Sequence, residues 1–198
     1  MNTYYISFDD TDNLDSPGTG HILTEFLESL PWKSSFISRH QLFVSPNVPY
    51  TSHNSSMVST VEGEVSCEEL IAKAVAHLEQ TLAPGADPGL CVAKADEIRF
   101  PEKLVKWGYR AKKEVLTKAE AYALADECGV HLSEHGGTGQ GVVGALAAVG
   151  LRLAGQDGRI KGKKCVEGSR MTVRELLEQT GFQRVKNLVK DFLVGIAD

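Results

Sequence analysis

Strand-like and helix-like segments alternate through the first 95 residues, and this order constrains the fold more than any other feature. Apolar and β-prone residues favour strands at 4–8, 35–44, 57–65 and 90–93. Between them, apolar residues at helical spacing predict helices over 22–30 and 68–82. The resulting β-α-β-β-α-β order is typical of a ferredoxin-like sheet with helices on one face.

The second half of the chain is richer in helical signals. Pro101 is placed to begin a helix, and Thr117 with Glu120 forms the pattern of a capping box. A glycine-rich stretch then leads into a helix of small residues, and "TVRELLEQTG" predicts one more helix. We therefore expect an α+β fold with its two halves packed as one unit. The halves are residues 1–95, the βαββαβ sheet, and 96–198, the helix-rich part.

Composition narrows the class of protein. The 198 residues include 21 Lys and Arg against 26 Asp and Glu, a net charge of -5. That balance argues against binding nucleic acid through bulk charge, although a local basic patch remains compatible with it. The four cysteines show no metal-ligand spacing, and no apolar run approaches the roughly 18–20 residues that span a bilayer. We expect a cytoplasmic protein with reduced cysteines and no membrane contact.

An acidic loop, "FDDTDNLDSPGTGH", follows the first strand. Asp9, Asp10 and Asp12 supply the hard oxygen ligands that Mg²⁺ prefers. The glycines that follow open a helix, whose N-terminal amides favour a phosphate. The alternative is a solvated turn in which Asp12 or Thr19 caps the helix. From the residues alone, both interpretations stay open.

A glycine loop at 136–141 precedes the small-residue helix, and Gly139 to Gly144 spells GxGxxG. Asp157 lies at a suitable distance for a ribose contact in a dinucleotide site. However, no second parallel strand is expected after the helix, and no Lys-Ser or Lys-Thr follows Gly141 as in a Walker A loop. Two interpretations remain: an anion-binding helix N-terminus, or glycines and alanines that allow close helix packing.

A third polar loop, "SPNVPYTSHN", is stiffened by Pro46 and Pro49. It presents Asn47, His53 and Asn54 as fixed donors or acceptors. Such loop residues either contact a ligand or are simply solvated.

Together these segments resemble a known family. "ISFDDTDN…GTG", "PNVPYTSHN", "DPG" and "GTGQGVVGALAAVG" are similar, in order and spacing, to motifs in the N-terminal kinase-like domain of tRNA(Ile) 2-agmatinylcytidine synthetases. The resemblance extends from the first strand to about Asp157. It implies a domain that binds ATP and Mg²⁺ and phosphorylates the C2 carbonyl oxygen of a cytidine. Agmatine then displaces this phosphorylated oxygen.

Carried over to this chain, the resemblance implies three catalytic and metal-binding aspartates, Asp9, Asp10 and Asp12. It further implies a nucleotide-binding set made of Thr11, Gly18, Thr19, Gly20, His21, Asn47, Asn54, Gly137, Thr138, Gly139, Gln140 and Gly141.

The chain also departs from the family. His21 stands where one of two paired threonines is expected, and the second motif lacks a lysine. The family continues into RNA-binding domains and a zinc ribbon, whereas this sequence ends at Asp198 without a CxxC pair. We therefore expect a stand-alone kinase-like domain over 1–198.

The expected activity is an ATP/Mg²⁺-dependent phosphotransferase acting on a small or nucleoside-like substrate. The alternatives are a non-catalytic nucleotide-binding module, and the ATP-using subunit of a split tRNA-modifying enzyme. In the latter, tRNA is a partner only if a separate subunit supplies the RNA-binding domains. A homo-oligomer is among the assemblies that the sequence allows.

Overall fold

The computed structural model describes residues 1–46, 54–160, 172–180, 184–187 and 192–196. The chain divides into two compact units, Met1–Lys161 and Gly162–Asp198. The boundary falls inside the predicted helix-rich half, and the assignment of residues 1–198 to one kinase-like domain stays a prediction.

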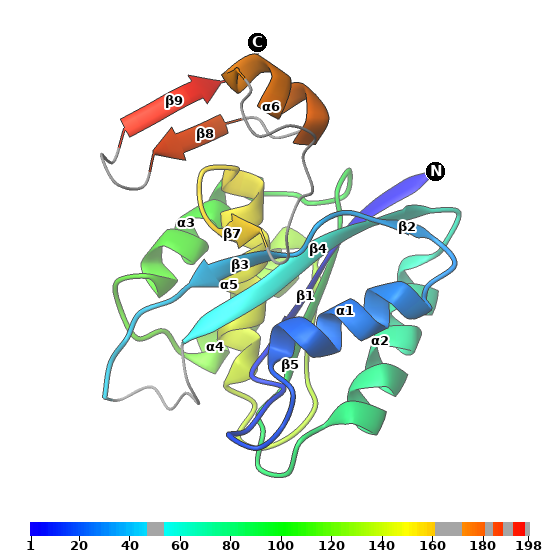
Figure 1. Cartoon of the computed structure of the whole chain (residues 1–198). Coiled ribbons are helices and arrows are strands. Elements are labelled where there is room, and N and C mark those ends of the chain that lie inside the picture. The colour runs from blue at the N-terminus through cyan, green and yellow to red at the C-terminus, as the bar shows by residue number, and fades with distance from the viewer. Residues whose placement is uncertain (47–53, 161–171, 181–183, 188–191, 197–198) are drawn as a thin grey trace. The chain divides into compact units, whose positions relative to one another are not determined.

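A mixed sheet-and-helix architecture makes up the first unit (Figure 1). Its elements are β1 (Asn2–Asp9), α1 (Thr19–Ser29), β2 (Lys33–Ser34), β3 (Ser38–Gln41), β4 (Ser55–Gly63), α2 (Cys67–Thr81), β5 (Gly89–Lys94), α3 (Pro101–Ala111), α4 (Lys118–Cys128), β6 (His131–Glu134), α5 (Gly141–Ala154) and β7 (Arg159–Ile160). The strands form one seven-stranded sheet in the order β6-β5-β1-β4-β3-β7, with β2 paired to β4. Every pair of neighbouring strands is antiparallel.

The α+β class is therefore confirmed. With the two-residue β2 set aside, the chain follows the predicted β-α-β-β-α-β order from β1 to β5. Of the strand expected over 35–44, only β3 is formed, and the two-residue β2 lies just before that range. The predicted capping box is present, because Thr117 and Glu120 satisfy each other's backbone amides at the start of α4.

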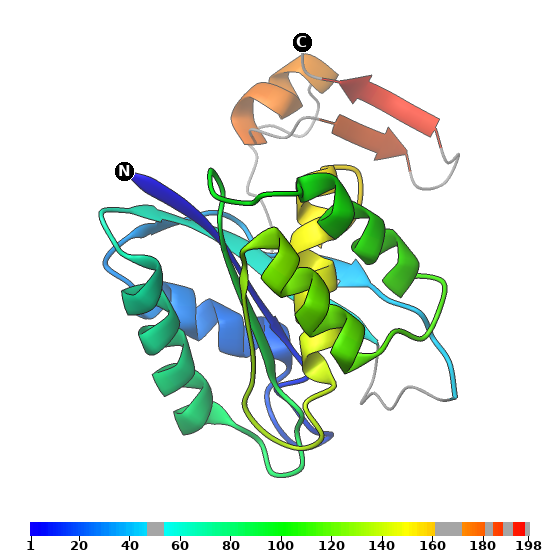
Figure 2. The ribbon, with the colours of Figure 1, turned by 180° about the vertical axis from the view of Figure 1, so that it is seen from behind.

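Helices cover both faces of the sheet. Helices α1 and α2 lie on one face, as predicted, and α3, α4 and α5 lie on the other, which Figure 2 shows from behind. The residues of β1 alternate accordingly: Tyr4, Ile6 and Phe8 are buried with α1 and α2. The intervening residues of β1, ending at Asp9, face the side of α5.

Helix α5 is the central helix of the second face. Ten of its fourteen residues are buried, which is typical of a helix surrounded by protein on all sides. Its small residues allow close approach: a Cβ added at Gly150 would lie 1.9 Å from the carbonyl oxygen of Leu104 in α3. The packing interpretation of this glycine- and alanine-rich segment therefore holds for the body of α5.

The second unit consists of α6 (Val173–Thr180) and an antiparallel pair of strands, β8 (Arg184–Asn187) and β9 (Phe192–Ile196). The predicted "TVRELLEQTG" helix is confirmed as α6. Within the described part of the chain, no helix has the length and apolarity needed to cross a membrane. Three cysteines in these ranges, Cys67, Cys91 and Cys128, are free thiols.

Candidate functional site

Three segments meet at the end of β1. Asp9, the last residue of β1, is paired with Gly89 at the start of β5. The backbone N–H of Asp87 donates to the carbonyl of Asp10 over 3.0 Å. Gly89 and Gly141 touch backbone to backbone, since a Cβ on Gly89 would lie 2.2 Å from the carbonyl carbon of Gly141. The acidic loop, the turn at 87–89 and the glycine loop are thus in direct contact.

The Asp9 carboxylate is directed toward the first turn of α5. A Cβ added at Gly144 would lie 1.7 Å from Asp9 Oδ2, so only glycine leaves room for this carboxylate. Asp9 is 9% exposed. Burial, together with the negative charges of Asp10 and Asp12, raises the pKa of Asp9 well above its usual value. Asp9 therefore favours its neutral form unless a positive charge lies nearby.

Asp10 begins the loop in a strained conformation, with φ of 52°. Burial and the charges of Asp87 and Asp12 raise the pKa of Asp10 to about 6. Backbone strain of this kind in a non-glycine residue is often found at functional sites. The observed strain and the mutual repulsion of the carboxylates both mark this loop as a candidate binding site.

Asp12 is tied to the start of α1. Its Oδ1 accepts a hydrogen bond of 2.9 Å from the Thr19 hydroxyl, and Thr19 Oγ1 also accepts the backbone N–H of Thr11. The N-cap residue of α1 is Gly18, which has no side chain of its own to cap the helix. Whether Asp12 or Thr19 caps α1 stays a prediction. The buried hydroxyl of Thr11 has no hydrogen-bond partner among the described residues.

The glycine loop donates its amides to Asp87. Asp87 Oδ1 accepts from the backbone N–H groups of Gly139 and Gln140, and Oδ2 accepts from the Thr138 hydroxyl. Gly137 and Gly139 have φ of 55° and 78°, values that glycine adopts without strain. An anion does occupy this loop, but it is a carboxylate of the chain itself.

Other predicted site residues have contacts of their own. His21 is exposed, and its Nε2 lies 3.2 Å from Glu25 Oε1. The Asn54 side chain donates to the carbonyl of Phe43 over 2.6 Å, which joins the two ends of the third loop. Asn47 and His53 lie outside the described residues. The structure thus brings the acidic and glycine loops together, whereas Asn54 has a structural contact.

Asp157, whose separation from the GxGxxG pattern along the chain suits a ribose contact, instead binds His40 and Lys112. Its Oδ1 lies 3.0 Å from Nδ1 of the buried His40, and its Oδ2 lies 2.7 Å from Lys112 Nζ. Burial raises the pKa of Asp157, but hydrogen bonds from His40 and Lys112 outweigh it and hold the pKa below its usual value. These contacts give Asp157 a structural role, which argues against the dinucleotide alternative.

The donor set at the acidic loop contains only oxygen atoms. Within the described ranges no group of three or more His, Cys, Asp or Glu side chains is arranged to hold a metal ion. Mg²⁺ is usually held by one or two carboxylates and completed by water and phosphate oxygens. The crowded carboxylates at Asp10 and the unpartnered Thr11 hydroxyl fit a Mg²⁺–nucleotide complex of this kind.

Sequence reasoning missed Asp87 as a site residue. Its position before Pro88 and Gly89 was recognised only as part of a motif. The signal that would have found it is a carboxylate in a proline–glycine turn that leads into a buried strand. Its partners, however, lie 51–53 residues further along the chain, so the sequence alone does not connect them.

The fold and these loops define an α+β chain with an acidic loop and an anion-filled glycine loop at one edge of the sheet. No family model matches the chain. Among curated proteins, it is similar to TiaS, the 2-agmatinylcytidine synthetase of an isoleucine tRNA, from Thermococcus sibiricus and from Pyrococcus horikoshii. Each is 26% identical over 155 residues, 75% of this chain, and the match covers 35% and 36% of those proteins.

Solved structures agree on the fold. The complex of TiaS with its isoleucine tRNA and ATP matches with a TM-score of 0.66 and 23% identity, over 76% of this chain and 36% of that one. The complex of TiaS with the same tRNA, AMPCPP and agmatine matches with a TM-score of 0.65 and 18% identity, over 100% and 50%. The chain is therefore TiaS-like and resembles one part of TiaS only, spanning about a third of the length of the curated relatives.

Proposed function

We propose that the chain is an ATP/Mg²⁺-dependent phosphotransferase that acts on a small or nucleoside-like substrate. The observation that carries the proposal is the junction of the acidic loop, which continues into α1, with the turn at 87–89 and the glycine loop. The solved structures that the chain resembles include complexes of TiaS with ATP and with AMPCPP, which supports an ATP-using role.

The roles follow from the contacts. Asp9, Asp10 and Asp12 would supply the Mg²⁺ site, with one or two of these carboxylates bound to the metal and the other positions taken by water and phosphate oxygens. The metal–nucleotide complex, when bound, supplies an activated phosphoryl group whose charge the metal partly neutralises. The remaining nucleotide contacts would come from two stretches near the aspartates: Thr11 with Gly18–His21, and the 137–141 loop. Asn47 and Asn54 would belong to the adjoining third loop.

The chain's own contribution is positioning. Phosphoryl transfer needs orientation and charge neutralisation more than covalent chemistry by the protein. The first turn of α1, with Gly18 as its N-cap and no acidic side chain, leaves its positive end toward the loop. Asp12 fixes Thr19 at that end, so the loop and the helix keep a constant spacing.

The test compares two aspartates of the same loop. Asp10→Asn removes a carboxylate at a position where asparagine tolerates the positive φ. Asp15→Asn is the matched control, because Asp15 is exposed in the same loop and belongs to no proposed contact. Thermal unfolding is followed with ATP, with and without Mg²⁺, alongside ATP turnover.

At 100 times Kd, ATP–Mg²⁺ should stabilise the wild type and Asp15→Asn by about 2.7 kcal/mol. We expect Asp10→Asn to lose both this Mg²⁺-dependent stabilisation and turnover. Undiminished turnover in Asp10→Asn would rule out the metal assignment. Stabilisation of the wild type without turnover would instead favour a non-catalytic nucleotide-binding module.

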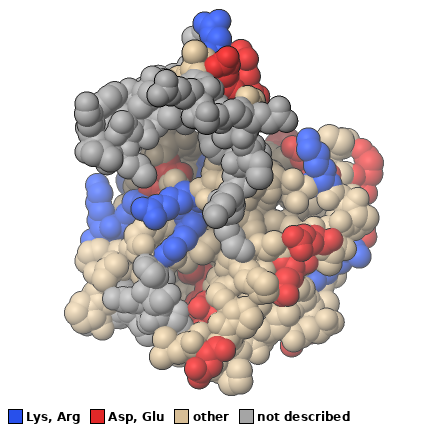
Figure 3. All heavy atoms as spheres, viewed as in Figure 1, with Lys and Arg blue, Asp and Glu red and all other residues tan. Residues whose placement is uncertain are grey.

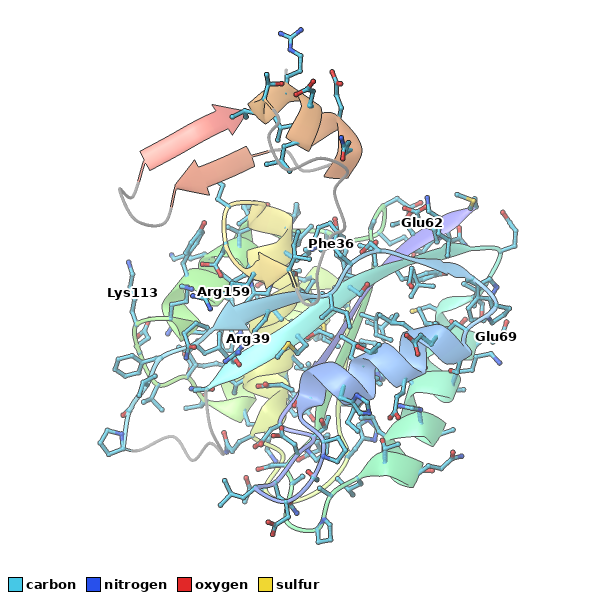
Figure 4. The ribbon with its side chains drawn as sticks, in the orientation of Figure 1. Phe36, Arg39, Glu62, Glu69, Lys113 and Arg159 are labelled. Carbon is cyan, nitrogen blue, oxygen red and sulfur yellow. The ribbon has the colours of Figure 1, made fainter. Side chains whose placement is uncertain are left out.

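A basic surface favours a second candidate, the ATP-using part of a tRNA-modifying enzyme. Arg39 and Arg159 face each other across β3 and β7, although like charges in this position are destabilising. Figure 3 shows Lys and Arg gathered on this part of the face, where Figure 4 labels Arg39, Arg159 and Lys113. Among the described residues these three form no ion pair.

An aromatic side chain lies near the same strand. Phe36 is 40% exposed, and the guanidinium of Arg152 lies 3.9 Å from its ring centroid. Basic side chains on β3 and β7, with an exposed aromatic ring shortly before β3, fit a nucleic-acid strand better than a small substrate. The double change Arg39→Gln/Arg159→Gln should weaken RNA binding and reduce its salt dependence without changing ATP affinity. If the wild-type protein does not bind RNA, this second candidate is contradicted and the small-substrate proposal is favoured.

A further inference from the structure

We propose that His131 and His135, which lie on either side of Ser133 along β6, form a binding site for a divalent transition-metal ion such as Zn²⁺. The proposal goes beyond the proposed function, because neither histidine belongs to the acidic loop or to the nucleotide-binding set. Imidazole nitrogens suit zinc, copper and nickel, whereas the oxygen ligands of the acidic loop suit Mg²⁺.

The two imidazole rings converge on one point. Nε2 of His131 lies 2.9 Å from the hydroxyl oxygen of Ser133, and Nε2 of His135 lies 2.8 Å from the same oxygen. Zn²⁺ binds imidazole nitrogen at about 2.0–2.1 Å. Small rotations of the two rings toward each other, with the hydroxyl turned aside, would therefore bring both nitrogens into bonding distance of one ion.

An ion from solution can reach this point. Leu132 packs against the cluster formed by α3, α4 and α5, so its neighbours His131 and Ser133 face the other side of the sheet. Within the described part of the chain, β6 is the end strand of the sheet. The side chains of His131, Ser133 and His135 are all partly exposed.

Both rings are in the protonation state that metal binding requires. Burial lowers the pKa of His131 and of His135, and the proximity of His135 lowers the pKa of His131 further, so both imidazoles are neutral at pH 7. The Ser133 hydroxyl can donate to one ring only, so the other ring donates its Nε2 hydrogen to the hydroxyl oxygen. On metal binding this hydrogen would move to Nδ1 of the same ring, which frees both Nε2 lone pairs without loss of a proton.

A carboxylate from α2 is available to complete the site. No third His, Cys, Asp or Glu side chain is in place beside the two histidines in the described ranges. The negative charge of Glu79 nevertheless acts on His135, whose pKa it raises against the effect of burial. We assign this exposed carboxylate as the third ligand, with water in the remaining position, as in zinc sites that keep an open position.

The site adjoins the glycine loop. The backbone N–H of His135 donates to the carbonyl of Pro88 over 2.9 Å, and the next residue, Gly136, is the first of the loop. An ion held by both histidines would therefore tie β6 to the start of that loop.

The test is titration calorimetry with Zn²⁺ on the whole chain after treatment with a chelator, without nucleotide and with excess Mg²⁺ to compete for the acidic loop. We expect His131→Ala and His135→Ala each to raise the Kd about tenfold or more, because a residue that only supports a metal ligand is already worth about ten- to a hundredfold. Ser133→Ala should still bind Zn²⁺, since the hydroxyl is not a ligand. Glu79→Gln should bind more weakly, whereas Glu69→Gln, the matched control on an exposed position of the same helix, should bind like the wild type.

Absence of Zn²⁺ binding by the wild type, or binding by either histidine variant as tight as that of the wild type, would overturn the proposal. Unchanged affinity in Glu79→Gln would overturn the assignment of the third ligand. If a histidine variant does not fold, NMR of the ring nitrogens of the six histidines in the wild type decides. Zn²⁺ should then shift Nε2 of His131 and His135, and shifts confined to other histidines would contradict the site. None of these measurements depends on ATP binding, so failure of the proposed function leaves the test intact.

Discussion

Asp157→Ala should destabilise the first unit by more than an ordinary surface substitution does. The carboxylate lies 3.0 Å from Nδ1 of His40, which is 0% exposed, and the other ring nitrogen of His40 lies 2.8 Å from Ser38 Oγ. Leaving a buried polar group without its partner costs about 1–3 kcal/mol. Loss of the partly exposed ion pair with Lys112 adds about 0–1 kcal/mol, so the total is about 1–4 kcal/mol.

Urea unfolding followed by tryptophan fluorescence suits this measurement. Both tryptophans, Trp32 and Trp107, belong to the first unit, so the signal reports on that unit. The midpoint should fall at unchanged m-value, which indicates a loss of stability alone. Asp96→Ala, an exposed carboxylate, should change stability by less than about 0.5 kcal/mol.

The contribution of Asp157 to stability should depend on pH in a definite direction. Hydrogen bonds from His40 and Lys112 hold the folded-state pKa of Asp157 below its usual value of about 3.9. The charge of Asp157 therefore stabilises the protein above about pH 4, and this contribution is lost as the pH falls through the lower folded-state pKa. In Asp157→Asn this contribution should be missing across the whole range.

A destabilisation below about 0.5 kcal/mol in Asp157→Ala would refute the structural role of this carboxylate. If Asp157→Ala is stable but has lost an affinity for NAD that the wild type shows, the dinucleotide interpretation of the glycine loop is supported instead. The two outcomes are distinguishable because stability and ligand affinity are measured separately.

Three further predictions concern stability. Ser56→Ala should change the unfolding free energy by less than about 0.5 kcal/mol, because the buried Ser56 hydroxyl has no partner among the described residues. Ser38→Ala should cost about 1 kcal/mol or more in the same urea assay, since Ser38 is bonded to buried His40. Thr117→Ala should cost about 1 kcal/mol by removing the capping box with Glu120, whereas Thr117→Ser should be close to neutral.

The elements of the fold could be predicted because their signals are local. The run from β1 to β5 and the capping box of α4 depend on residues within one or two turns or along one strand. The break between β2 and β3 was missed. The backbone N–H of Ser35, which lies between these strands, donates to the carbonyl of Thr60 in β4. No local sequence pattern predicts this contact.

The residues of the candidate site stay predictions, and the geometry that joins them could not be predicted from the sequence. Alternation along β1 implies that Asp9 points away from Phe8, yet nothing nearby in sequence shows that this side is covered by α5. Only Gly144, more than a hundred residues later, makes room for the carboxylate. In the same way, the glycines of the 136–141 loop suggested a phosphate, and the anion they bind is Asp87.

The three neighbouring aspartates of the acidic loop therefore differ in what a ligand must do to reach them. Asp12 already accepts a hydrogen bond from Thr19, and Asp9 is buried against α5. The carboxylate of Asp10 is repelled by the negative charge of Asp87. A divalent cation would relieve that repulsion most at Asp10, where the backbone is also strained. The effect of single substitutions on Mg²⁺ affinity should accordingly be largest at Asp10, and equal effects at all three would mean that the loop rearranges on binding.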